Sequence, residues 1–276
     1  MLRDRARSAA LLVPPLLLVL WLGGPWIVAL VAVAVAIGAR EAFRLLEAAG
    51  HPAFPALGIV LALVVALADS ISAVPGGAGL LLAAIGIVLV GAAALTRQDP
   101  RDGLACFATT TFAALYVGLL GFVPRLAVQA PAIPEGAPLA FLGPERGWIL
   151  LLILSVWAFD TGAYLVGRRY GRRKFMAHIS PAKTVEGVVG GTVAVTIVAT
   201  LIVAGLGRSW PAGLVLGPIV AAAAQTGDLV ESMLKRAAGA KDSGTLIPGH
   251  GGVLDRVDSF LFAAPALMLY AVVVFR

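Results

Sequence analysis

The feature that most constrains this chain is a succession of apolar stretches that recurs from one end to the other. Hydrophobic residues make up 60% of the 276 residues and charged residues 13%. Soluble domains usually have ~45–50% hydrophobic residues and ~25% charged residues. A soluble fold of this length could not bury so much apolar surface, whereas a lipid bilayer can accommodate it. We therefore expect an all-α, polytopic integral membrane protein.

About nine stretches are candidates for transmembrane helices. They cover residues 9–22, 25–47, 54–69, 77–96, 104–123, 147–166, 185–205, 211–231 and 253–274. A transmembrane helix needs about 20 apolar residues, so the first and third are short for a span. Arg3, Arg5 and Arg7 precede the first stretch, as in a secretory signal, but apolar sequence continues to Gly38. That length exceeds the ~7–15 residues of a signal core and favours a retained span over a cleaved signal.

The basic residues are distributed unevenly among the loops. With the N-terminus in the cytosol, nine spans place Arg125, Arg146, Arg208 and Arg276 on the far side and the other 17 of the 21 Lys and Arg residues on the cytosolic side. This is the asymmetry of the positive-inside rule. The net charge of +6 therefore indicates topology, and we expect no nucleic-acid partner. The pattern predicts a multi-pass protein of the cell membrane with its N-terminus and polar site in the cytosol.

Three regions are expected along the chain. Residues 1–123 would hold the first five spans, and residues 147–276 the last four, which carry nearly all the polar clusters. Residues 124–146 contain five prolines, cannot stay helical for long, and are expected to form a non-cytosolic connector. The single cysteine, Cys106, can form neither an intrachain disulfide nor a thiolate metal cluster, so we expect a small buried hydrophobe.

The first polar cluster lies on span six. Trp157, Asp160, Thr161 and Tyr164 share one helical face. An ionisable residue within a span costs roughly 2.5–3.5 kcal/mol on insertion, so Asp160 needs a cation, a metal or a proton. A structural ion pair with an Arg on another helix is the alternative, but the shared polar face favours a functional Asp160.

The second cluster precedes span seven. Ser180 followed by Pro181 is typical of a helix start, which would put Lys183 in the first turn. Free backbone N–H groups there favour an anion, so Ser180 and Lys183 are predicted to bind phosphate. Gly187 and Gly191 form a GxxxG pair, which favours close helix packing.

The third cluster, residues 227–259, is the most informative. Asp228, Glu231, Ser232 and Lys235 follow helical spacing at the end of span eight, and Asp255, Asp258 and Ser259 do so at the start of span nine. We expect these two acidic helix ends to face each other across a Gly-rich, basic loop.

These residue types point to phosphate chemistry. Carboxylates are hard ligands that suit Mg²⁺, which usually binds one or two of them together with substrate phosphates. Phosphate oxygens would be neutralised by Lys235, Arg236, Lys241 and Arg256. Gly251 and Gly252 would let backbone N–H groups approach an anion, and His250 between glycines has no structural need. The alternative is a salt-bridged loop without a ligand.

A 27-residue segment resembles the signature of the phosphatidate cytidylyltransferases. It reads Ser232-x-Leu-Lys-Arg-x4-Lys-Asp-x-Gly-x2-Ile-Pro-x-His-Gly-Gly-Val-x-Asp-Arg-Val-Asp258 and matches at every specified position. The segments Trp157-x-x-Asp160-Thr-x-Ala-Tyr164 and Ser180-Pro-x-Lys183-Thr-x-Glu186-Gly187 look like the second conserved region of the same family. The resemblance covers about residues 157–259, and the first 120 residues match only in having apolar spans.

The resemblance implies an all-helical membrane enzyme that makes CDP-diacylglycerol and pyrophosphate from CTP and phosphatidate. It implies Mg²⁺ at Asp228 and Asp255, with Asp258 close by, and leaves open whether one or two ions bind. It also implies a homodimer within membrane lipid, with a polar cavity open to the cytosol. Ser232 would contact phosphate and not act as a nucleophile, because a phosphate monoester with a second pKa near 6 is already dianionic.

Three other functions are alternatives to this interpretation. A lipid transporter or flippase would favour charges near the bilayer midplane and repeated halves, which this sequence lacks. A CDP-alcohol phosphotransferase would continue differently after Asp102-Gly103. A CTP-dependent lipid kinase would use the same nucleotide, and only the match to the 27-residue signature favours a cytidylyltransferase over it.

Overall fold

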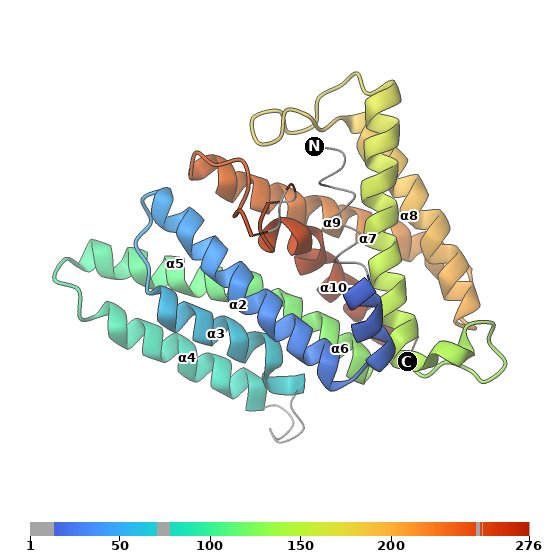
Figure 1. Ribbon diagram of the computed structural model, residues 1–276, viewed down its shortest axis with the longest axis horizontal. Helices are drawn as coiled ribbons and strands as arrows, with labels where there is room; N and C mark the ends of the chain where they lie inside the picture. The colour runs from blue at the N-terminus through green and yellow to red at the C-terminus, as the bar shows by residue number, and fades with distance from the viewer. Residues whose placement is uncertain (1–13, 71–77, 247–248, 250, 276) are drawn as a thin grey trace. The chain divides into compact units, whose positions relative to one another are not determined.

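The computed structural model describes residues 14–70, 78–246, 249 and 251–275, and every regular element in these ranges is helical (Figure 1). The α-helices are α2 (Pro25–Ala48), α3 (Pro55–Leu67), α4 (Ala78–Ala94), α5 (Pro100–Gly118), α6 (Phe122–Gln129), α7 (Gly143–Tyr170), α8 (Val185–Gly205), α9 (Pro211–Ala237) and α10 (Leu254–Val274). Short 3-10 helices lie at Ala68–Ser70, Leu119–Gly121 and Ala140–Leu142. Residues 14–22 are also helical. The all-α prediction is confirmed.

Six helical stretches of the described chain are long and apolar enough to cross a membrane. They are Pro25–Ala48, Pro100–Gln129, Ala140–Tyr170, Val185–Gly205, Pro211–Ala237 and Leu254–Val274. Two further apolar helices, Pro55–Ser70 and Ala78–Ala94, are shorter. The chain is thus a multi-pass membrane protein, and the count of about nine spans stays a prediction. Residues 9–13, which begin the first expected span, and the topological charges Arg3, Arg5, Arg7 and Arg276 lie outside the described residues.

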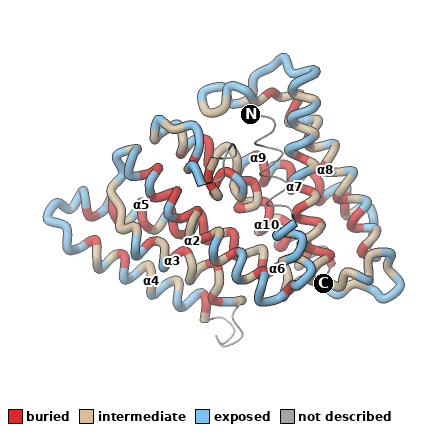
Figure 2. Tube along the Cα trace, in the orientation of Figure 1, coloured by how far each residue is buried: buried red, intermediate tan, exposed pale blue. Residues whose placement is uncertain are grey.

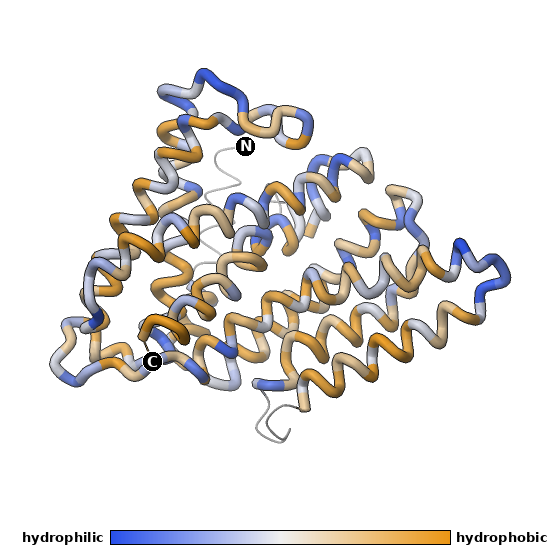
Figure 3. The backbone as a smooth tube through the Cα atoms, turned by 180° about the vertical axis from the view of Figure 1, so that it is seen from behind, coloured by the Kyte–Doolittle hydropathy of each residue, from blue (hydrophilic) through white to orange (hydrophobic). Residues whose placement is uncertain are grey.

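Many large apolar side chains point outward from the helices. On α4, Leu80 is 79% exposed and Val88 68%, and on α8 Leu201 is 67% exposed. Exposed positions recur along whole helices (Figure 2), and the helices are predominantly hydrophobic while the connections are more hydrophilic (Figure 3). Such surfaces are unfavourable in water but suit contact with lipid chains.

The chain divides into two compact units that are not consecutive in sequence. One comprises residues 1–124 and 233–257, and the other residues 125–232 and 258–276. Helices α9 and α10 therefore each contribute to both units. In the first unit α3 packs against α2, α4 and α5. In the second unit α7 and α8 pack along each other.

Small residues set the helix packing in the first unit. Gly58 of α3 lies directly against the ring of Phe43, which is 1% exposed on α2. Gly121 lies against the backbone of Ala66, and Gly118 against Val65 and the Ala62 carbonyl. A side chain at these glycines would push the helices apart, so the glycines explain why helices this apolar can approach so closely.

We expect the two ends of α7 to lie on opposite sides of the membrane, because this helix is long and apolar enough to cross it. Glu135 precedes α7 and His178 follows it, and both are exposed. A cysteine at either position, in a Cys106→Ser background, should react with an impermeant thiol reagent from one side only. The sides should differ, and the basic loops predict the cytosolic side for position 178. Labelling of both positions from the same side would contradict a crossing by α7.

Candidate functional site

A cavity of about 530 Å³ lies among α7, α8, α9 and the segment before α8. Four residues predicted from the sequence line it: Asp160, Ser180, Lys183 and Asp228. They come from segments up to about 70 positions apart in the chain, so the fold of the second unit brings them together. The remaining lining residues are Phe159, Ala163, Tyr164, Gly167, Arg168, Ala182, Thr184, Gly187, Val188 and Gln225.

An ion pair between Lys183 and Asp228 is central to this cavity. Lys183 Nζ lies 2.6 Å from Asp228 Oδ2, and the two side chains are 20% and 32% exposed. Ser232, one turn further along α9, donates a hydrogen bond of 3.2 Å to Asp228 Oδ1. The pair is sheltered but reachable. A phosphate could therefore compete for the ammonium group, and a cation for the carboxylate.

The backbone around Lys183 differs from the sequence prediction. Helix α8 begins at Val185, and its N-cap is Thr184, whose hydroxyl accepts a hydrogen bond from Gly187 N at 3.2 Å. Lys183 therefore precedes the helix, and the prediction that Ser180-Pro181 starts it was wrong. The reason is a competing pairing: Phe175 N donates to the Lys183 carbonyl at 3.0 Å, which commits this residue to an extended segment.

Glu186 holds this extended segment in place. Its carboxylate accepts hydrogen bonds from the backbone N–H of Arg172 at 2.9 Å and of Arg173 at 3.1 Å. The Arg173 guanidinium also pairs with it at 3.2 Å, but that side chain is 76% exposed and contributes little. Glu186 thus joins the first turn of α8 to the start of the connection that follows α7. From the sequence alone, Glu186 was assigned only a place in the second region that resembles the family.

Glycines allow α7 and α8 to approach closely beside the cavity. A Cβ atom at Gly187 would come within 2.8 Å of the Ala163 carbonyl oxygen and 3.2 Å of Gly167 Cα. One at Gly191 would lie 2.7 Å from the Phe159 carbonyl oxygen. The predicted packing role of the GxxxG pair is confirmed.

A second ion pair lies in the first unit. Lys235 Nζ lies 2.7 Å from Asp255 Oδ1, and the side chains are only 12% and 5% exposed. Asp255 Oδ2 accepts three hydrogen bonds of 2.8 Å, from Ser243 N, Ser243 Oγ and Gly252 N. Neighbouring Gly251 has a φ of +78°, which favours glycine, and a Cβ there would press on the Asp255 carboxylate. Asp255 is therefore rigidly held in the first turn of α10.

Sequence reasoning missed another buried carboxylate, Glu41 of α2, which is 4% exposed. It accepts hydrogen bonds from Ser243 Oγ at 3.1 Å, Val253 N at 3.1 Å and Leu254 N at 2.8 Å. One signal was available: Glu41 follows Gly38 by three residues and precedes Leu45 by four, so helical spacing puts it on a buried face. Its partners, more than 200 residues away, were not predictable.

The other predicted residues are placed as follows. Arg236 is exposed and donates to the Ala240 carbonyl at 3.1 Å, and Lys241 and Arg256 are also exposed. Asp258 Oδ1 accepts a hydrogen bond from Ser259 N at 2.6 Å. His250 lies outside the described residues. Gln225, which sequence reasoning missed, lines the cavity and is 7% exposed.

The carboxylates of Asp228 and Asp255 differ in how readily they could bind a metal ion. Within the described ranges, no three His, Cys, Asp or Glu side chains gather in a group that could enclose a metal ion. Mg²⁺ does not need such a cage, because it is commonly held by one or two carboxylates and by substrate phosphates. Asp228, partly exposed on the cavity, fits that role. Asp255 has three donors on Oδ2 and Lys235 Nζ on Oδ1, so it could offer Oδ1 to a metal ion only if Lys235 moved away.

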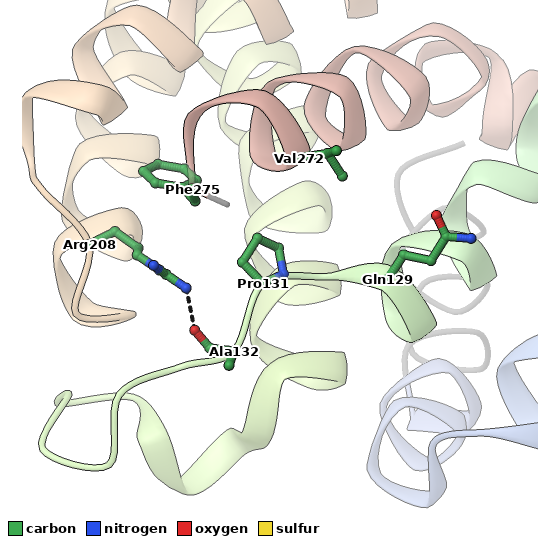
Figure 4. Close-up of a pocket in the computed structure, with 6 residues that line it drawn as sticks. All are labelled: Gln129, Pro131, Ala132, Arg208, Val272 and Phe275. Carbon is green, nitrogen blue, oxygen red and sulfur yellow. Dashed lines mark hydrogen bonds between the residues drawn. The ribbon is translucent and has the colours of Figure 1, made fainter.

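A separate cavity of about 610 Å³ has a different character (Figure 4). It is lined by Gln129, Pro131, Ala132, Arg208, Val272 and Phe275, and none of these is a predicted site residue. Arg208 donates to the Ala132 carbonyl and lies over the Phe275 ring at 5.7 Å. With its one cation engaged and no carboxylate in its lining, this cavity offers no comparable chemistry.

Comparison with known proteins gives a consistent result. A family model described as the cytidylyltransferase family matches residues 3–274. A phosphatidate cytidylyltransferase of Synechocystis is 35% identical over 91% of this chain and 90% of its own length. A chloroplastic phosphatidate cytidylyltransferase of Arabidopsis thaliana is 35% identical over 87% of this chain and 65% of its own length. The enzyme of the same name from Bacillus subtilis is 47% identical over 44% of this chain and 45% of its own length.

Gly187→Ala should destabilise the contact between α7 and α8, because its Cβ would meet the Ala163 backbone, which cannot move aside without shifting α7. Such overpacking typically costs about 1–3 kcal/mol. Thermal unfolding of the purified variant in detergent should begin at a lower temperature than for the wild type. Gly136→Ala is the matched control, because a Cβ there meets nothing within 4 Å. Equal stability of both variants would show that α7 and α8 are not packed as described.

Proposed function

Because the chain belongs to the cytidylyltransferase family, we propose that it is a phosphatidate cytidylyltransferase, which transfers CMP from CTP to phosphatidate and yields CDP-diacylglycerol and pyrophosphate. The observation that carries the proposal is the pair of Lys183 and Asp228, which lines a cavity in an otherwise apolar protein. The names of relatives that align with most of the chain support it.

The reaction needs no enzyme nucleophile. An oxygen of the phosphatidate phosphate forms a bond to the α-phosphorus of CTP, while the bond from that phosphorus to the β-phosphate oxygen breaks. Pyrophosphate leaves with the electron pair. A phosphate monoester is mostly dianionic at neutral pH, so no base is needed to deprotonate it. The protein must instead bring two highly charged anions together and neutralise them.

Lysines and arginines supply this neutralisation. Lys183 would bind phosphate on leaving Asp228, and Lys235, Arg236, Lys241 and Arg256 would contact the nucleotide phosphates. Ser180, Ser232, Asp160 and His250, with the backbone of Gly251 and Gly252, would position the substrates. An exposed cation such as Lys241 would act chiefly in binding, whereas the held side chain of Lys235 is suited to stabilising charge in the transition state.

We also propose that Mg²⁺ is required, with Asp228 and Asp255 as ligands and Asp258 nearby, whether one ion binds or two. When bound, Mg²⁺ neutralises charge on the phosphate oxygens and orients them for in-line displacement. Asp228 and Asp255 are each paired with a lysine. On binding, Mg²⁺ would take the place of the lysine at the carboxylate, and a substrate phosphate would take the place of the carboxylate at the lysine. The net charge around each group would stay balanced.

The orientation of the site in the membrane is inferred from the distribution of basic residues along the chain. We propose that the protein resides in the cell membrane, that its site and N-terminus face the cytosol, where CTP is made, and that two copies associate. The lipid substrate would approach from the bilayer. A CTP-dependent lipid kinase is the rival that shares this nucleotide, and it would transfer the γ-phosphate instead.

Position-specific labelling of CTP separates the two reactions. Purified protein incubated with phosphatidate, Mg²⁺ and CTP labelled at the α-phosphate should yield a labelled lipid that migrates as CDP-diacylglycerol. CTP labelled at the γ-phosphate should release labelled pyrophosphate and leave the lipid unlabelled. Chelation of Mg²⁺ with EDTA should stop both. Label from the γ-phosphate in the lipid would contradict the proposal in favour of a kinase, and an unlabelled lipid in both reactions would contradict either enzyme.

A further inference from the structure

We propose that Glu41 is a positioning residue: it fixes the segment at Ser243, Val253 and Leu254, and through these residues the Asp255 carboxylate and its pair with Lys235. The effect on catalysis rests on the function proposed above, whereas the effect on the segment does not. The proposal gives the N-terminal helices, which lack the signature motifs, a direct part in building the site.

Glu41 lies within hydrogen-bond distance of three donors, all in the same distant segment, and it shares one of them, the Ser243 hydroxyl, with Asp255. Ser243 Oγ lies 3.1 Å from Oε2, Leu254 N donates to Oε2 at 2.8 Å, and Val253 N donates to Oε1 at 3.1 Å. Val253 and Leu254 stand at the N-terminus of α10, where backbone N–H groups lack partners within the helix. Glu41 therefore caps α10 from another helix, and its charge suits the positive end of the helix dipole.

Ser243 connects Glu41 to Asp255. Its hydroxyl lies 2.8 Å from Asp255 Oδ2 and 3.1 Å from Glu41 Oε2, and it carries one hydrogen, so it can donate to only one carboxylate at a time. Ser243 N donates to Asp255 Oδ2 as well, at 2.8 Å. A shift of Glu41 would therefore move the group that supplies two of the three hydrogen bonds to that oxygen.

The packing around Glu41 is tight and explains two glycines. A Cβ atom at Gly244 would lie 2.6 Å from Glu41 Oε1. One at Gly252 would press on the Glu41 carboxylate and on Ser243 Oγ. Both glycines belong to the 27-residue signature segment, so part of that segment is shaped to fit a carboxylate outside it. A surface-exposed Glu would impose no such restriction.

Because Glu41 is buried, it depends on the hydrogen bonds from the segment as much as the segment depends on it. Placing a carboxylate in an apolar environment costs several kcal/mol unless hydrogen bonds compensate. Glu41 is 4% exposed and lies beside buried Ala42, so its compensation comes from Ser243 and the α10 terminus. If the segment moved away, Glu41 would lose its donors. The segment and α2 should therefore order each other.

Glu41 is assigned no contact with substrate. Its predicted role is to keep Asp255 in place, and small displacements of reacting groups can lower rates by about 10²-fold. Such a defect should appear in turnover more than in CTP binding, because Glu41 would act through Asp255, whereas CTP would also be bound by cations outside the segment, such as Arg236 on α9.

The variant Glu41→Gln tests this arrangement, since it keeps size but places an NH₂ group among hydrogen-bond donors. Hydrogen–deuterium exchange of the purified protein in nanodiscs should be about tenfold faster in peptides covering 242–254, which reports a loss of local stability without any assay of activity. Glu47→Gln is the matched control, because Glu47 lies on the same helix and is exposed. Its exchange should equal that of the wild type.

Turnover provides the second readout. At a temperature where Glu41→Gln is folded, kcat should fall by about tenfold or more while the KM for CTP changes by less than about threefold. The proposal would be overturned if the variant only lowered the amount of folded protein, while the folded fraction kept the exchange rate and the kcat of the wild type. Faster exchange with normal kcat would overturn the catalytic consequence.

If Glu41→Gln does not fold, Ser243→Ala gives the same comparison, because it removes the hydroxyl between the two carboxylates and keeps the backbone donors. Faster exchange of 242–254 with lower kcat would support the proposal, and unchanged values of both would overturn it. A wild-type protein that makes no CDP-diacylglycerol would refute the proposed function, while the exchange experiment would still decide the role of Glu41 in the segment.

Discussion

An ionic group in a mostly apolar, membrane-spanning protein needs a partner, and two lysine–aspartate pairs meet that requirement. Lys183 is paired with Asp228 in one unit, and Lys235 with Asp255 in the other. Each pair is more than half buried, so each ion would be costly alone. The same groups are those that a phosphate and a cation would bind. Under the proposed function, each pair would supply a cation for phosphate and a carboxylate for a metal ion.

Each unit also contains a glutamate that binds backbone N–H groups and thereby holds a reactive residue in place. Glu186 accepts from Arg172 and Arg173 and holds the segment that carries Lys183. Glu41 accepts from the start of α10, next to Asp255. Glu41 compensates backbone donors at the N-terminus of α10, which would otherwise lack partners, and Glu186 compensates two donors in the connection that follows α7. Catalysis by positioning and charge neutralisation requires such fixed groups.

The sequence predicted the helices well, because the bilayer imposes a strong constraint on apolar length. The range expected for span seven, 185–205, is the range of α8, and the expected ranges 25–47 and 253–274 differ from α2 and α10 by one residue at one end. The start of α8 at Val185 conflicted with the signal at Ser180-Pro181, because a pairing with Phe175, outside the local pattern, determined the backbone.

The site was predictable in part. Asp160, Ser180, Lys183 and Asp228 share a cavity, which agrees with their shared chemistry as read from the sequence. The pairing of Lys183 with Asp228 was not predicted, because helical periodicity relates only neighbours along one helix. Glu41 was missed for the same reason: its partners lie more than 200 positions away, and a lone Glu among arginines looks like an exposed charge.

The central claim is that Lys183 and Asp228 have separate chemical roles and are not merely a structural ion pair. Exchanging them, with Lys183→Asp and Asp228→Lys in one protein, tests it most directly, because the exchange keeps the opposite charges together. The account predicts a folded protein, judged by thermal unfolding in detergent, whose transfer of α-labelled phosphate from CTP to lipid is at least about 10²-fold below the wild type. Activity near the wild-type level in the exchanged protein would contradict the claim, because a structural pair would be all that the reaction requires.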